Sequence, residues 1–85
     1  MVEDKMFNRY LAKVVKKERA NRGLTQVQLG EMAGVTMETI SRLETGRHIP
    51  RLYTLCTLLD AMGLEVSFEV KEKEKINEEN NTTMA

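Results

Sequence analysis

The sequence predicts a small, mostly α-helical domain of four helices, followed by one short β-strand that pairs with its copy in a second chain. Apolar residues recur at helical spacing as far as residue 62. Glycines and N-cap residues divide this stretch into four helical segments. Residues 64–70 then alternate strictly between apolar and polar, which is typical of a half-buried strand. With 85 residues, the chain has room for one domain.

The first helix is expected over residues 5–22. One face is apolar and the other carries lysine and arginine, as in an amphipathic helix that packs on a core. Asp4 is a suitable N-cap, and Gly23 followed by Leu24 is a pattern that ends helices with the glycine in the left-handed conformation. The apolar positions are Phe7, Tyr10, Leu11, Val14 and Val15.

Two short helices are expected next, over residues 26–33 and from Thr36 to about Thr45. Thr25, with Gln28 three residues later, forms a capping box at the start of the first of them. Helices of this length are not stable alone, so they must pack across each other and onto the first helix. The N-cap and the terminating glycine are Thr25 and Gly34 for one helix, and Thr36 and Gly46 for the other.

The rest of the chain is expected to hold one more helix, a strand and a tail. Pro50 leads into a fourth helix over residues 51–62. Residues 71–85 contain almost only Lys, Glu, Asn and Thr, so they are expected to be a disordered charged tail. The predicted organisation is therefore a helical domain over 5–63, a dimerisation strand over 64–70 and a tail over 71–85. The apolar face of the strand consists of Leu64, Val66, Phe68 and Val70.

A formal net charge of zero conceals opposite charges in two parts of the chain. Residues 5–51 contain ten Lys or Arg against four Glu, a net charge of +6. Residues 65–85 contain three Lys against six Glu, a net charge of −3. A nucleic acid responds to local charge, so the zero total does not exclude it. The alternative is that the basic residues form only a solvated helix face.

Several classes of protein are not supported by the composition. With one cysteine the chain cannot form an intramolecular disulfide, and one cysteine and one histidine are too few for a four-ligand zinc site of these residues. Only this one cysteine and one histidine are available for a nucleophile–base pair. No glycine-rich phosphate loop and no metalloprotease motif is present. No apolar run approaches the roughly 18 residues of a membrane span, and no signal peptide opens the chain. The sequence predicts a cytoplasmic protein that is not an enzyme and holds no metal or cofactor.

Residues 26–43 combine the features of a helix-turn-helix. Gly30 is small at the point where two steeply crossing helices must approach each other, and Gly34 supplies the positive backbone angle of the turn. Branched apolar residues are spaced so that they lie beneath the second helix. They are Val35, Ile40 and Leu43.

The stretch TQVQLGEMAGVTMETISRLETGRHIP resembles the Cro/CI-type (XRE) helix-turn-helix family. The resemblance rests on its Thr-Gln opening, Ala-Gly turn, Ile-Ser-Arg and Glu-x-Gly segments and final Pro, and it covers residues 7–63. It implies a lambda-repressor-like bundle that binds double-stranded DNA. A strand stands in place of the family's fifth helix, and in this the chain resembles the HipB-like antitoxin branch.

The resemblance implies a DNA-binding surface around the second helix of the motif, which enters the major groove by its N-terminal end. Arg42 is suited to a guanine edge, Glu38 to a cytosine amine and Met37 to a thymine methyl group. The start of the preceding helix and the loop after the motif are expected to meet backbone phosphates. The predicted DNA-binding residues are Thr25, Gln26, Thr36, Met37, Glu38, Thr39, Ser41, Arg42, Arg47 and Arg51.

Three residues near this surface have simpler interpretations. Glu38 can favour the helix dipole without touching DNA. Glu44 is expected to pair with a neighbouring arginine, and His48 to be an ordinary loop residue.

The lone strand predicts a homodimer, because a single strand leaves its backbone groups unpaired. A two-fold dimer would place two recognition helices on a near-palindromic operator. The sequence thus predicts a transcriptional repressor that is the antitoxin of a toxin–antitoxin operon, with a toxin protein as a further partner. The alternatives are a plain XRE regulator without a toxin, and a toxin-neutralising protein whose DNA binding is secondary.

Overall fold

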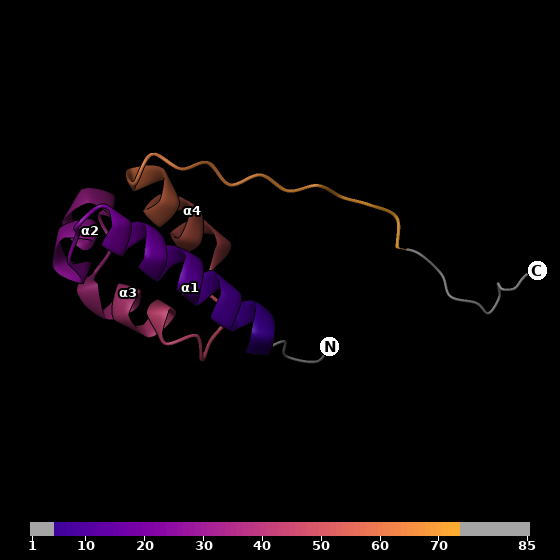
Figure 1. Ribbon diagram of the computed structural model, residues 1–85, viewed down its shortest axis with the longest axis horizontal. Coiled ribbons are helices and arrows are strands. Elements are labelled where there is room, and N and C mark those ends of the chain that lie inside the picture. Colours follow the sequence, from indigo (N-terminus) through magenta and orange to yellow (C-terminus); the bar gives the residue numbers. More distant parts are fainter. Residues whose placement is uncertain (1–4, 74–85) are drawn as a thin grey trace, which may run out of the picture.

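A computed structural model describes residues 5–73, which form a bundle of four helices (Figure 1). The predicted helices are confirmed, and each end lies within one residue of its expected position. Asp4 and residues 74–85 of the predicted tail lie outside the described residues. The helices are α1 (Lys5–Asn21), α2 (Gln26–Ala33), α3 (Met37–Glu44) and α4 (Leu52–Ala61).

The interior of the bundle is aliphatic, and every helix contributes to it. Val15, Leu29, Ile40 and Leu58, one from each helix, have no exposed surface. Helix α2 packs against α3 and α4, and α1 packs against α3. Complete burial of such a side chain contributes about 1.5–3 kcal/mol. The position of α3 is therefore fixed by a core that all four helices share.

Gly30 allows the close approach of α2 to the segment that leads into α3. It is buried, and a methyl group at this position would lie well inside contact distance of the Val35 carbonyl oxygen. The same glycine's carbonyl oxygen accepts a hydrogen bond from the Val35 N–H at 3.0 Å. A glycine is therefore needed at this crossing, because any side chain would clash with the backbone of Val35.

Residues 64–73 leave the end of α4 as an extended segment that runs back past α4 and away from the bundle (Figure 1). No β-ladder forms within residues 5–73, so a single chain does not form the strand predicted over 64–70. A strand needs a hydrogen-bonded neighbour, and the other elements of the described chain are helices. Leu64 and Val66 pack against the core, whereas Phe68 and Val70 are exposed. Pairing with a second copy stays a prediction.

Candidate nucleic-acid interface

Helix α2 begins with the predicted capping box. The Gln28 N–H donates to Thr25 Oγ1 at 3.0 Å, and the Thr25 N–H donates to Gln28 Oε1 at 2.8 Å. The N–H groups of Gln26 and Val27 lie in the first turn, where no intrahelical acceptor exists. The start of α2 therefore presents main-chain donors to an anion, as the sequence predicts for a backbone phosphate.

The turn into α3 is set by Gly34 and Thr36. Gly34 has a φ of 70°, in the left-handed region that favours glycine. Thr36 Oγ1 accepts from the Thr39 N–H at 3.2 Å, and the two threonine hydroxyls share a hydrogen bond of 2.8 Å. Both hydroxyls thus stabilise the N-terminal end of α3, the end predicted to enter the major groove.

Helix α3 presents the predicted recognition face to solvent. Ile40 and Leu43 are buried in the core. Glu38 and Arg42 lie on the opposite face and are exposed, and Met37 is 40% exposed at the first turn. Thr39 and Ser41 are half-buried at the margins of this face. The sequence-predicted residues of α3 are therefore brought together on one side of one helix.

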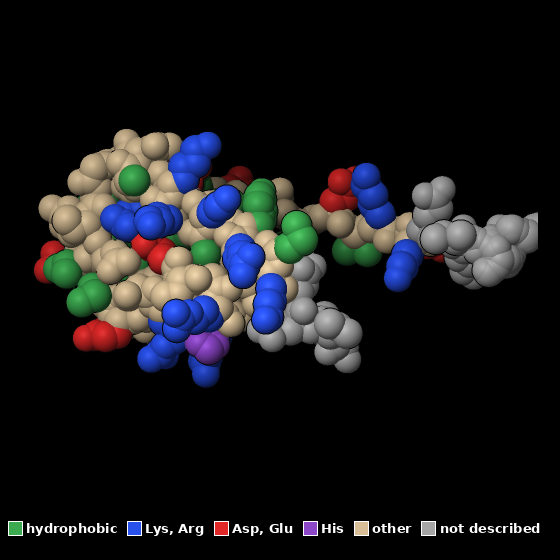
Figure 2. All heavy atoms as spheres, turned by 60° about the horizontal axis from the view of Figure 1, so that its bottom comes forward, with side chains coloured by type: hydrophobic (Ala, Val, Ile, Leu, Met, Phe, Trp, Pro, Cys, Tyr) green, Lys and Arg blue, Asp and Glu red, His purple; other side chains and the backbone are tan. Residues whose placement is uncertain are grey.

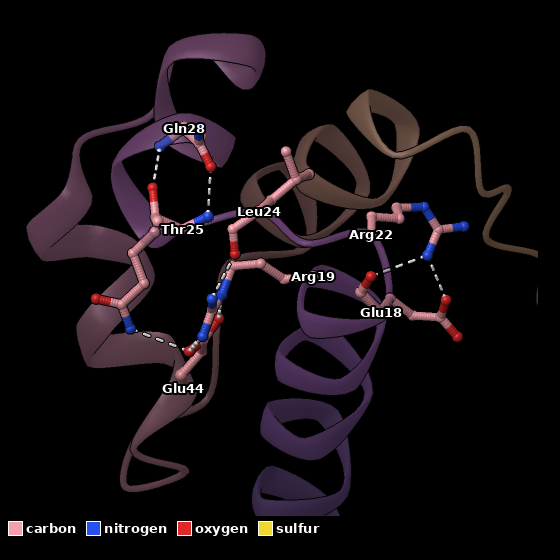
Figure 3. Close-up of polar contacts among 8 residues, drawn as sticks. Glu18, Arg19, Arg22, Leu24, Thr25, Gln28 and Glu44 are labelled. Carbon is pink, nitrogen blue, oxygen red and sulfur yellow. Dashed lines mark hydrogen bonds and ion pairs between the residues drawn. The ribbon is translucent and has the colours of Figure 1, made fainter.

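A partly buried polar network ties α1, α2 and α3 together (Figure 3). Arg19 Nε and Nη2 donate to the two carboxylate oxygens of Glu44, at 2.8 and 2.9 Å. Gln26 Nε2 donates to Glu44 Oε1 at 3.0 Å, and Arg19 Nη1 donates to the Leu24 carbonyl oxygen at 2.7 Å. The predicted pairing of Glu44 with an arginine is confirmed. One amide N–H of Gln26, a predicted phosphate ligand, is used inside the protein.

The network keeps Glu44 ionised. Burial acts to raise the pKa of Glu44, but hydrogen bonds from Arg19 and Gln26 and the charge of Arg19 outweigh it, so the pKa lies below its ordinary value. The hydrogen bond to Glu44 raises the pKa of Arg19 in turn. The side chains of Arg19 and Glu44 are 14% and 4% exposed. This bidentate pair is therefore a structural contact that holds α3 in position against α1.

The arginines of the candidate interface differ from Arg19 and Arg22 in their ion pairing. Arg19 and Arg22 are held by carboxylates, whereas Arg42, Arg47 and Arg51 have no ion-pair partner among residues 5–73. Figure 2 shows Lys and Arg side chains gathered around the histidine. Unpaired cations on one surface attract a polyanion.

His48 belongs to this surface, which sequence reasoning missed. It lines an open cleft between α3 and α4 together with Arg42 and Arg51. Two hydroxyl groups, those of Thr39 and Thr54, also line the cleft, and no carboxylate does. The loop after α3 and the start of α4 bring these residues around one cleft.

The described residues offer little to a metal or a membrane. Among residues 5–73, no three side chains of His, Cys, Asp or Glu come together as a metal site would require. In the same part of the chain, no helix has the length and apolar character needed to cross a membrane. The surface that stands out is the basic one around α3.

The fold and the position of α3 define a helix-turn-helix domain, and a helix-turn-helix family model matches residues 15–68. The chain therefore belongs to the XRE-type helix-turn-helix family. It is 40% identical over 65 residues to an immunity repressor protein of Bacillus phage phi105. The matched region is 76% of this chain and 45% of the phage protein. The chain thus spans less than half the length of this relative.

Two further proteins are similar to this chain. An uncharacterized HTH-type transcriptional regulator of Methanothermobacter thermautotrophicus is 40% identical over 52 residues, 61% of this chain and 75% of that protein. A structure described as a toxin–antitoxin module from Streptococcus pneumoniae superposes with a TM-score of 0.64 at 25% identity. That match covers 84% of this chain and 83% of the other. The solved structure has the same fold, and the two relatives matched by sequence are described as a repressor and a transcriptional regulator.

Proposed function

We propose that this protein is a sequence-specific DNA-binding repressor that acts as a homodimer. The observation that carries the proposal is the exposed face of α3, flanked by Arg42, Arg47 and Arg51 without carboxylate partners in the described chain. Arg19 and Arg22, by contrast, are engaged by carboxylates within the chain. The relatives described as a repressor and as a transcriptional regulator support the same function.

In this proposal α3 reads bases and its surroundings hold the DNA backbone. Arg42 is exposed and grips a guanine edge through two hydrogen bonds, while Glu38 accepts from a cytosine amine and Met37 touches a thymine methyl group. Thr36, Thr39 and Ser41 line the same end and margins of the helix. The N-terminus of α2, with Thr25 and Gln26, and the loop with Arg47 and Arg51 bind phosphates.

Arg42→Ala is expected to weaken binding to the preferred duplex by about 1–3 kcal/mol and to relax the preference at one base pair. The reason is that alanine leaves a guanine edge without its bidentate partner. The measurement is fluorescence anisotropy with a duplex obtained by in vitro selection and with a scrambled one. Lys17→Ala is the control, since Lys17 lies on α1 and is exposed. Equal weakening on both duplexes would assign Arg42 to phosphate contact instead of base recognition.

The dimer is proposed to form through an antiparallel ribbon of two 64–70 segments, with Leu64, Val66, Phe68 and Val70 on one face. Such a ribbon satisfies the backbone groups that a lone extended segment leaves open. All four aromatic side chains are more than half exposed in the single chain: Phe7 51%, Tyr10 62%, Tyr53 82% and Phe68 70%. Aromatic residues contribute strongly to protein interfaces, so their exposure supports contacts with other chains.

We further propose that the protein is the antitoxin of a toxin–antitoxin pair and regulates its own operon. Support comes from the structural similarity to a protein described as a toxin–antitoxin module. A toxin protein is then a second partner. The competing function is a plain regulator without a toxin, and the remaining alternative is a toxin-neutralising protein whose DNA binding is secondary.

Deletion of residues 71–85 is expected to separate these functions. The segment carries four Glu against three Lys, so phosphate does not attract it, and operator affinity should be unchanged or slightly raised. If the segment captures a toxin, the deletion should abolish neutralisation of the product of the adjacent gene in a growth assay. Loss of operator binding would contradict the proposed division of roles. Retained neutralisation would assign capture to another surface.

A further inference from the structure

A second basic surface lies beside the proposed interface, in a groove between α1 and the end of α3. Three cations from α1 line it, Arg9, Lys13 and Lys16, together with Ala12. Its other wall is Glu44, Thr45 and Gly46. Figure 2 shows several Lys and Arg side chains spread across one face of the molecule. The groove is thus built from two elements that the fold brings together.

Gly46 is what lets the two walls meet. Its φ is 73° and it is buried, and a Cβ at this position would lie 3.3 Å from the Arg9 Cα and Cγ atoms. The chain that leaves α3 therefore rests directly against the turn of α1 that carries Arg9. The spacing of the cations at i, i+4 and i+7 keeps all three on the side of α1 that faces this contact.

The positive charge of the groove exceeds the negative charge that lines it. Arg9, Lys13 and Lys16 are exposed and have no ion-pair partner among residues 5–73. Glu44 is the one carboxylate of the groove wall, and its oxygens already accept hydrogen bonds from Arg19 and Gln26. The charge of Lys16 also helps to lower the pKa of Glu44. One carboxylate is thus shared between Arg19 and Lys16, and the groove keeps an excess of positive charge.

Helix stability does not account for this pattern. Like charges four residues apart, as at Arg9 and Lys13, disfavour a helix. At the C-terminal end of α1, Glu18 pairs with Arg22 in the turn that follows, in the favourable i and i+4 arrangement with an N–O distance of 2.6 Å. A helix face that was only solvated would also be stabilised by residues of opposite charge at i and i+4. The uniform sign therefore indicates an anionic ligand.

The position of the groove indicates which anion. Thr45 and Gly46 follow α3 directly, and Glu44 links the groove to Gln26 at the start of α2. Seven residues of helix span roughly 10 Å, the axial length of about three phosphate-to-phosphate steps along one DNA strand. We propose that Arg9, Lys13 and Lys16 bind backbone phosphates of the DNA that flanks the half-site read by α3. This inference rests on the proposed DNA-binding function.

The test compares salt dependence on two duplexes, one limited to the selected site and one with about eight further base pairs on each side. The variant is Lys13→Gln with Lys16→Gln. The control is Lys17→Gln with Lys71→Gln, which removes the same charge from exposed residues outside the groove. Thermal unfolding of each variant checks that the exposed substitutions leave the fold intact.

The wild type is expected to bind the longer duplex more tightly and with a steeper dependence of log K on log salt. The groove variant should lose most of this gain, with the slope reduced by about two per protomer and the base preference unchanged. A groove variant that keeps the wild-type slope on both duplexes would overturn the inference and leave the proposed function standing. A wild type without preference for any duplex would overturn the proposed function itself.

Discussion

Replacing Glu44 with alanine is expected to lower the free energy of unfolding by about 1.5–3 kcal/mol, the range for hydrogen bonds to charged groups. The carboxylate is 4% exposed and accepts hydrogen bonds from Arg19 and Gln26. Its loss leaves the guanidinium of Arg19 partly buried without a counter-charge. Urea denaturation followed by circular dichroism measures the change.

Glu18→Ala is the matched control for this prediction. Glu18 on α1 also pairs with an arginine, at 2.6 Å from Nη1 of Arg22 in the following turn, but the two side chains are 30% and 32% exposed. An exposed pair of this kind contributes up to about 1 kcal/mol. Equal destabilisation by Glu18→Ala and Glu44→Ala would contradict the structural role assigned to the Arg19–Glu44 pair.

The pH dependence of stability should identify the same carboxylate. The pKa of Glu44 in the folded protein lies below its ordinary value, so its stabilisation is present above that value and is lost as the pH falls through the folded pKa. The wild type should therefore lose stability from about pH 5 downward. Glu44→Gln should be less stable at neutral pH and should lose less over the same acid range. If the free energy of unfolding fell with pH in parallel for the two proteins, Glu44 would not contribute to the pH dependence of stability.

The helices were predictable because their boundaries depend on neighbouring residues. The Thr25–Gln28 capping box and the positive φ of Gly34 are local, and both are found as predicted. The recognition face follows from the same logic, since burial of Ile40 and Leu43 turns Glu38 and Arg42 outward. Periodicity and capping within about twenty residues thus determine the part of the site that lies on α3.

The contacts that position this helix were not predictable in detail, because they join distant residues. Glu44 meets Arg19, 25 residues away, and Gln26, 18 residues away. The sequence indicates an arginine partner for Glu44 but not which one, since the choice depends on how α1 crosses α3. The groove of Arg9, Lys13 and Lys16 depends on tertiary packing in the same way, because its other wall is formed by Glu44, Thr45 and Gly46. The predicted strand needs a hydrogen-bonded neighbour that residues 5–73 do not supply.

Placing an aspartate on the apolar face of residues 64–70 is expected to dissociate the proposed homodimer. Val66→Asp would bury a charge against apolar neighbours, at a cost of several kcal/mol. Because Val66 also packs against the core of its own chain, this variant alone can lower the stability of the monomer. Phe68→Asp avoids this, since Phe68 is 70% exposed in the single chain.

Sedimentation velocity at micromolar concentration measures the result. The wild type should sediment as a dimer, and Phe68→Asp as a folded monomer with a dimer dissociation constant raised at least about a hundredfold, or roughly 3 kcal/mol. Ser67→Asp is the control, because alternate residues of a strand point to opposite faces and Ser67 is exposed. It should remain dimeric. A wild type that sediments as a monomer would contradict the ribbon, and with it the simultaneous binding of two half-sites by one dimer. A dimer that survives Phe68→Asp would move the interface to another of the exposed aromatic surfaces, such as that of Tyr53 on α4.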